Sequence, residues 1–84
     1  MDAISNESVK ALLKEKLPNA EIMVEGDGYH YRATIISDDF SGAPTVKRHK
    51  AVYAALNNAI TSGTLHALVL RTYTKAEWSA LQKT

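Results

Sequence analysis

The chain of 84 residues has no cysteine and only four glycines, two prolines and one tryptophan. The missing cysteine excludes a disulfide scaffold, a zinc site built from thiolates, a cysteine nucleophile and an iron–sulfur cluster held by the chain's own thiolates. No apolar run approaches the roughly 18 residues that cross a bilayer. Residues 1–10 (MDAISNESVK) lack the basic start and apolar stretch of a secretory signal. We therefore expect a cytoplasmic protein without a membrane span.

What the chain does contain is typical of one small globular domain over residues 1–84. Hydrophobic residues make up 45% of it and charged residues 23%. A chain this short buries only about 60–65% of its unfolded surface, which leaves little room for a deep catalytic cavity. The charge is uneven: residues 1–43 hold four basic and eight acidic side chains, and residues 44–84 hold six basic and one acidic. Such asymmetry favours charged partners but does not indicate which kind of partner.

The hydrophobic pattern predicts six elements in the order helix, strand, strand, helix, strand, helix. Their approximate ranges are 5–16, 20–25, 30–37, 45–62, 65–73 and a short helix after Thr74. Gly26-Asp27-Gly28 joins the first two strands as an antiparallel hairpin. The third strand follows a helix and is expected to pair in parallel through a right-handed crossover. The simplest result is an α+β domain whose three-stranded mixed sheet is covered by helices on one face.

Two helices carry more specific expectations. In the long helix, the residues expected to face the core are Val46, Tyr53, Leu56 and Ile60, supported by Val52 and Ala59. In the last helix, Thr74 and Glu77 have the spacing of a capping box, and Trp78 and Leu81 are expected to face inward. The uncovered face of the sheet is expected to carry Met23, His30 and Arg32.

Each of the three histidines has a structural and a functional interpretation. His66 opens the last strand, His30 follows the Gly-Asp-Gly turn on the open face, and His49 is in line with apolar residues of the long helix. Imidazole is the commonest neutral metal ligand, but a histidine on a helix stripe or strand is usually structural. No spacing matches a zinc site, and no Ser–His–Asp or paired-carboxylate arrangement is present. We therefore predict that the protein is not an enzyme.

The only basic cluster is Lys47-Arg48-His49-Lys50, near the start of the long helix. It can contact phosphate oxygens of a nucleic acid, contact an acidic partner protein, or simply form a solvated helix face.

Three stretches together resemble the BolA family, and in the Gly-Asp-Gly turn its acid-stress (IbaG-like) bacterial subgroup. The first is residues 24–31 (VEGDGYHY), a hairpin before a His-aromatic pair. The second is residues 40–42 (FSG) followed by 46–53 (VKRHKAVY), and the third is residues 65–68 (LHAL) followed by 72–78 (TYTKAEW). The resemblance extends from the first helix to Trp78 and implies a class II KH-like fold, which agrees with the predicted order of elements.

The resemblance implies a complex with a monothiol glutaredoxin that shares a two-iron, two-sulfur cluster and glutathione, for iron–sulfur trafficking or iron and stress sensing. His66 matches the family's C-terminal cluster ligand. The family's second ligand is a Cys or His of the hairpin loop, but this chain has Asp27 there, and His30 is the nearest substitute. Alternatively His66 alone contributes, and the basic cluster docks the partner. No cofactor is expected in the isolated protein, which would be a monomer or weak homodimer.

The resemblance also implies DNA binding as a stress-linked transcription regulator. KH folds that grip nucleic acid use a Gly-x-x-Gly loop. The glycines at positions 26, 28, 42 and 63 include no pair three apart. DNA binding would then rest on phosphate contacts from the basic cluster and weaken with salt. The glutaredoxin function is the favoured interpretation.

Overall fold

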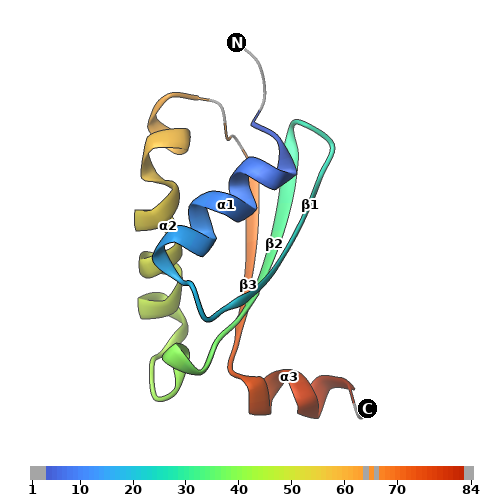
Figure 1. Ribbon diagram of the computed structural model, residues 1–84, viewed down its shortest axis with the longest axis vertical. Helices are drawn as coiled ribbons and strands as arrows, with labels where there is room; N and C mark the ends of the chain where they lie inside the picture. The colour runs from blue at the N-terminus through green and yellow to red at the C-terminus, as the bar shows by residue number, and fades with distance from the viewer. Residues whose placement is uncertain (1–3, 64, 66, 83–84) are drawn as a thin grey trace.

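The computed structural model describes residues 4–63, 65 and 67–82, and these form a three-stranded sheet with helices on one face (Figure 1). The elements in chain order are α1 (Asn6–Lys16), β1 (Glu21–Gly26), β2 (His30–Ile36), the 3-10 turn η1 (Asp38–Phe40), α2 (Thr45–Thr61), β3 (Ala67–Tyr73) and α3 (Lys75–Gln82). The strand order is β1-β2-β3, with β2 antiparallel to β1 and parallel to β3. The predicted α+β class and mixed sheet are confirmed.

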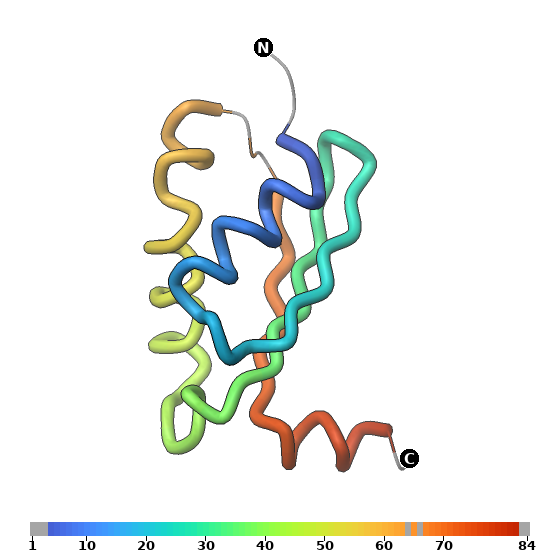
Figure 2. Tube along the Cα trace, in the orientation of Figure 1, coloured from blue at the N-terminus to red at the C-terminus, as the bar shows by residue number. Residues whose placement is uncertain are grey.

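The path of the chain places two groups of loops at opposite ends of the sheet. The Cα trace shows α1 and α2 packed on one face, and α2 running back from the end of β2 toward the hairpin end (Figure 2). α3 lies beyond the other end of the sheet (Figure 1).

In the described part of the chain, no helix has the length and apolar character needed to cross a membrane.

The first helix and the hairpin form as their sequences predict. The Ser5 side chain accepts from Ser8 N–H at 3.1 Å and caps α1, whose Val9 and Leu13 are fully buried. The inward residues of the hairpin enter the same core; they are Ile22, Tyr31, Ala33 and Ile35. Gly28, at φ +94°, occupies the left-handed region that the turn between the strands requires.

The prediction of which residues of α2 face the core is wrong in part. Val52, Leu56 and Ala59 are buried as predicted, but Val46, Tyr53 and Ile60 are 66, 43 and 38% exposed. The exposed residues repeat every seven positions and lie about a quarter turn from the buried ones. α2 therefore has two adjacent apolar stripes, and only one packs on the sheet.

The segment before α2 and the end of α3 also differ from expectation. Residues 38–44 belong to none of the six predicted elements, but η1 lies within them and Phe40 is only 3% exposed. The capping box of α3 is confirmed: Glu77 N–H donates to Thr74 Oγ1 at 3.1 Å, and Thr74 N–H donates to Glu77 Oε1 at 2.9 Å. Trp78 is half-buried beside Tyr73, whereas Leu81, expected to face inward, is 50% exposed.

Candidate functional site

Asp27 organises the hairpin turn, where one of the candidate ligand positions lies. Its Oδ1 accepts from Tyr29 N–H at 2.9 Å and from His30 N–H at 2.7 Å. These two bonds, that from His30 first, lower the pKa of the Asp27 carboxyl below its ordinary value. Asp27 therefore remains a carboxylate at neutral pH, with one oxygen engaged in the turn.

The second oxygen of this carboxylate faces a histidine. Asp27 Oδ2 lies 3.9 Å from His30 Nδ1, and both side chains are about 70% exposed. The Tyr29 ring lies against the imidazole edge-on, with centroids 4.8 Å apart. A depression of about 300 Å³ adjoins the pair on the open face of the sheet, and Arg32 and Val69 contribute to its lining. The turn thus presents to solvent one carboxylate oxygen and one imidazole nitrogen, which are both atom types that ligate metals.

The start of β3 meets this end of the hairpin. Ala67 is the register partner of His30, and its N–H donates to Tyr29 O at 3.4 Å. Leu65 is 2% exposed, and its N–H donates to Ala59 O at 3.2 Å. His66, the principal sequence-predicted ligand, lies outside the described residues. The described neighbours on either side of it belong to the hairpin end of the fold.

These donors do not make a closed metal site by themselves. Among the residues that the structure describes, no three His, Cys, Asp or Glu side chains gather closely enough to hold an ion. The whole chain also has no thiolate to offer.

The predicted basic cluster is split between two environments. Arg48 is turned inward, with its side chain 10% exposed, and forms a two-pronged ion pair with Glu77 at 2.7 and 3.1 Å. Its guanidinium also donates to Ala43 O at 2.8 Å and Thr72 O at 3.3 Å. These bonds tie α2 to β3 and α3, and they leave Arg48 little capacity for a phosphate or an external partner.

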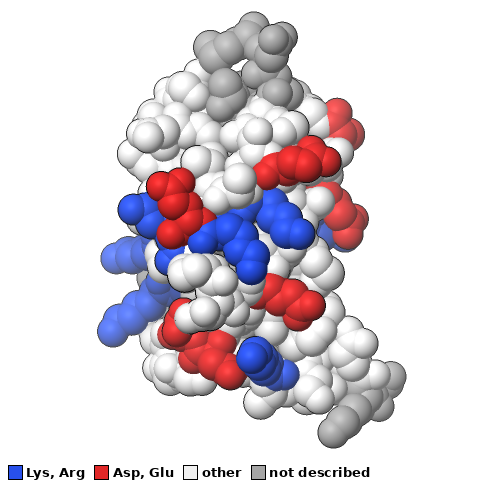
Figure 3. Space-filling view, viewed as in Figure 1, with Lys and Arg blue, Asp and Glu red and all other residues white. Residues whose placement is uncertain are grey.

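The remaining members of the cluster lie closer to solvent. Lys47 and Lys50 are exposed, and His49 is half-buried. Basic side chains gather over α1 and the outer side of α2, while acidic ones lie along the side where β1 runs and also beside the basic groups on the α2 side (Figure 3). The accessible positive charge of α2 therefore comes from Lys47 and Lys50. Sequence reasoning missed the bond between Arg48 and Glu77, because the two residues are 29 positions apart and no local pattern joins them.

Comparison with known proteins gives consistent results for sequence and fold. The family profile described as BolA-like protein matches residues 3–77. The acid stress protein IbaG of Escherichia coli K12 is 31% identical over 80 residues, which cover 95% of each chain. The DNA-binding transcriptional regulator BolA of the same organism is 39% identical over 59 residues, 70% of this chain and 55% of that protein.

A solved structure agrees with these matches. The structure of a BolA protein homologue from Coxiella burnetii superposes with a TM-score of 0.80 at 32% identity, and it covers 90% of this chain and 97% of that one. The family match and the structural match thus both extend over most of the chain. This chain belongs to the BolA-like protein family.

Proposed function

We propose that this BolA-family chain is a non-enzymatic adaptor that binds a monothiol glutaredoxin and shares a two-iron, two-sulfur cluster with it. The observation that carries the proposal is the hairpin end of the sheet. Asp27 and His30 are exposed there with facing donor atoms, and Ala67, the residue after His66, pairs with His30. The two described non-thiolate donors, Asp27 and His30, are an incomplete ligand set, which suits a cluster whose thiolates come from elsewhere.

Each residue of this end has a distinct role in the proposal. His66 is the principal ligand from this chain. His30 is the second ligand, since its imidazole is exposed and replaces the loop Cys or His of the family. Asp27 acts mainly through the turn, because its Oδ1 holds the backbone of residues 29 and 30 in place. Imidazole ligation raises the potential of a two-iron cluster relative to all-thiolate ligation, and the cluster here is a shared cargo.

The test is a titration of cluster-loaded monothiol glutaredoxin with this protein, followed by visible circular dichroism. We expect the wild type to produce a new spectrum and His66→Ala to abolish it. His30→Ala should reduce or alter the spectrum if the hairpin supplies the second ligand. His49→Ala tests docking separately, because His49 belongs to the basic cluster near the start of α2, and α2 begins at the opposite end of the sheet from the hairpin (Figure 1). A loss in this variant would point to partner docking by the basic cluster rather than to cluster ligation.

Two results would contradict the proposal. One is an unchanged spectrum on adding wild type at several-fold excess. The other is a new spectrum that persists in the double variant His30→Ala/His66→Ala, because the cluster would then have no ligand from this chain.

DNA binding is the second candidate, and one observation favours it. Lys47 and Lys50 are exposed on α2, and a relative named as a DNA-binding transcriptional regulator covers 70% of this chain. Such binding would rest on two lysines and would therefore be weak, sensitive to salt and poorly sequence-specific. Hairpin variants would leave it unchanged, which separates it from the first candidate.

A further inference from the structure

The hydrogen bonds at the two ends of the β2–β3 pairing show which backbone groups of β2 face β3. Ala67 N–H donates to Tyr29 O, and Ser37 N–H donates to Tyr73 O. In a strand, backbone groups of alternate residues point to the same side. The odd-numbered residues of β2 therefore bond to β3, and the even-numbered residues bond to β1.

This pattern identifies the free groups of β1, which is an edge strand. Asp27 N–H donates to His30 O, so Asp27 and His30 form the hydrogen-bonded pair next to the hairpin turn. Opposed residues in an antiparallel ladder alternate between bonded and non-bonded pairs. From the observed register, the backbone groups of Ile22, Val24 and Gly26 must point away from the sheet.

α1 occupies the two ends of this edge and leaves its middle open. Asn6 Nδ2 donates to Gly26 O at 3.4 Å, and Lys14 Nζ donates to Ala20 O at 2.7 Å. Lys10 lies between them on the same row of the helix, four residues from each. In the described part of the chain, no side chain bonds to the outward N–H or C=O groups of the residues at 22 and 24. The middle of the edge keeps the groups that another strand would pair with.

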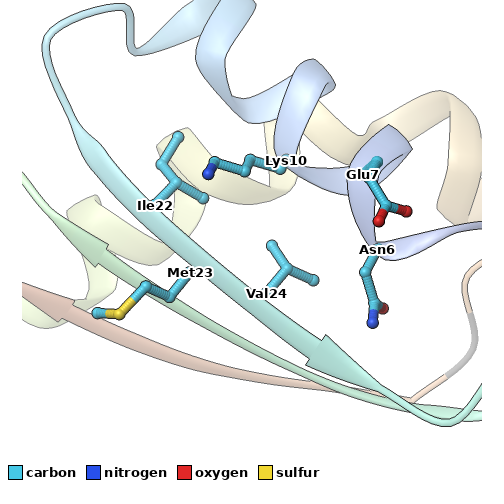
Figure 4. Close-up of a pocket in the computed structure, with 6 residues that line it drawn as sticks. All are labelled: Asn6, Glu7, Lys10, Ile22, Met23 and Val24. Carbon is cyan, nitrogen blue, oxygen red and sulfur yellow. The ribbon is translucent and has the colours of Figure 1, made fainter.

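A groove of about 340 Å³ lies between α1 and this open stretch (Figure 4). Ile22 and Val24 point from β1 toward α1, Lys10 extends toward Ile22, and Met23 points to the other face. The groove thus combines an apolar floor, a polar wall and a free strand edge. An extended peptide can use all three, since its backbone bonds to the edge while alternate side chains enter the groove.

The charges on the outer face of β1 determine which residues an added strand should carry. Glu21 and Glu25 are exposed and flank Met23, which is 41% exposed. Within the sheet, Glu25 is opposite Arg32, whereas Glu21 is opposite the apolar Ile36. Opposite charges on directly opposed residues stabilise strand pairing, and like charges destabilise it. An added strand with basic residues four positions apart would meet both glutamates.

The same charges disfavour a second copy of this chain as the added strand. Ile22 and Val24 are the residues whose outward backbone groups are free. The antiparallel register that pairs both of them places Ile22 of each copy opposite Val24 of the other. It then also opposes Glu21 of each copy to Glu25 of the other, with two like-charge pairs in one short ladder.

We infer that the outer edge of β1 is a docking site for an extended segment of another protein, added antiparallel as a fourth strand with the pattern basic–apolar–x–apolar–basic. The two basic residues pair with Glu21 and Glu25, and the two apolar residues enter the groove under α1. This site lies on a different edge from the start of β3 and goes beyond the proposed glutaredoxin function.

The probe is the capped peptide Gly-Lys-Val-Thr-Val-Lys-Gly, titrated into the ¹⁵N-labelled full chain without cluster and followed by amide chemical shifts. We expect the largest shifts at Ile22, Val24 and Lys10. Replacing both lysines of the peptide by glutamate should weaken binding at least fivefold. N-methylation of both valines should abolish binding of the peptide, because the amide groups of these valines donate hydrogen bonds to β1 in the antiparallel register.

Two variants complete the test. The double variant Glu21→Lys/Glu25→Lys should reverse the preference and bind the glutamate peptide more tightly than the lysine peptide. Val24→Pro removes one outward N–H without breaking the β1–β2 ladder, and it should abolish binding of both. Shifts confined to the open face, an N-methylated peptide that binds equally well, or no preference reversal would overturn the inference. Concentration-dependent shifts at Ile22 and Val24 without peptide would overturn it in favour of a second copy.

Discussion

Glu77 is a residue whose charge couples three elements of the fold. Its carboxylate accepts from the Arg48 guanidinium at 2.7 and 3.1 Å and from Thr74 N–H at 2.9 Å. These bonds, that from Arg48 first, lower the pKa of Glu77 from 4.5 to about 2. The folded state therefore holds this proton less tightly than the unfolded state does, and the charged form stabilises the fold.

This coupling predicts a specific pH dependence of stability. The contribution of Glu77 is present above pH 4.5 and is lost as the pH falls through about 2. Glu77→Gln keeps an acceptor for the capping box but removes the charge. We expect the variant to be less stable than wild type at pH 7 and the difference to shrink between pH 4.5 and 2, as measured by urea unfolding. A difference that stays constant with pH would contradict the ion pair, and Glu15→Gln on the exposed face of α1 is the control.

At the scale of elements, the two apolar stripes of α2 differ sharply in expected energetic weight. Leu56 is fully buried, and Leu56→Ala should cost about 2–5 kcal/mol in free energy of unfolding. Val46 is 66% exposed, and Val46→Ala should change stability by about 0.5 kcal/mol or less. Urea unfolding of the two variants checks the assignment. Comparable losses would mean that the 46–53–60 stripe is also packed in solution.

The sequence could not separate these stripes, and the reason is physical. Val46, Tyr53 and Ile60 repeat every seven residues, which is as regular a helical pattern as that of the buried Val52, Leu56 and Ala59. Periodicity reports that a helix has an apolar side, but which side is covered depends on where the sheet lies. By contrast, the order of elements and the inward residues of the hairpin were predictable, because strand alternation and turn chemistry are local.

The site was predictable to the same limited degree. The Gly-Asp-Gly turn and the helix capping box are short-range patterns, and both were recognised. The bond from Arg48 to Glu77 and the α1 side chains over the edge of β1 join residues far apart in the chain. They follow from packing that no local pattern specifies, so Arg48 was grouped with Lys47 and Lys50 although its side chain is turned inward.

At the scale of the whole molecule, the described residues form three surfaces with different chemistry, of which the first two adjoin at Glu25 and Gly26. The hairpin end carries exposed donors, the middle of the β1 edge carries free backbone groups beside glutamates, and the outer side of α2 carries Lys47 and Lys50. Because these surfaces share few residues, substitutions can test the candidate activities separately.

DNA binding is the activity for which the whole-molecule charge matters most. Each lysine that contacts a phosphate contributes roughly 0.9 to the slope of log affinity against log salt. If Lys47 and Lys50 both contact DNA, Lys47→Glu/Lys50→Glu should reduce that slope by about 2 and weaken binding similarly across sequences. Fluorescence anisotropy with a labelled duplex at several salt concentrations measures both quantities. Lys10→Glu/Lys16→Glu on α1 changes the net charge equally, so an identical loss in this control would mean that overall charge, not the α2 surface, determines binding.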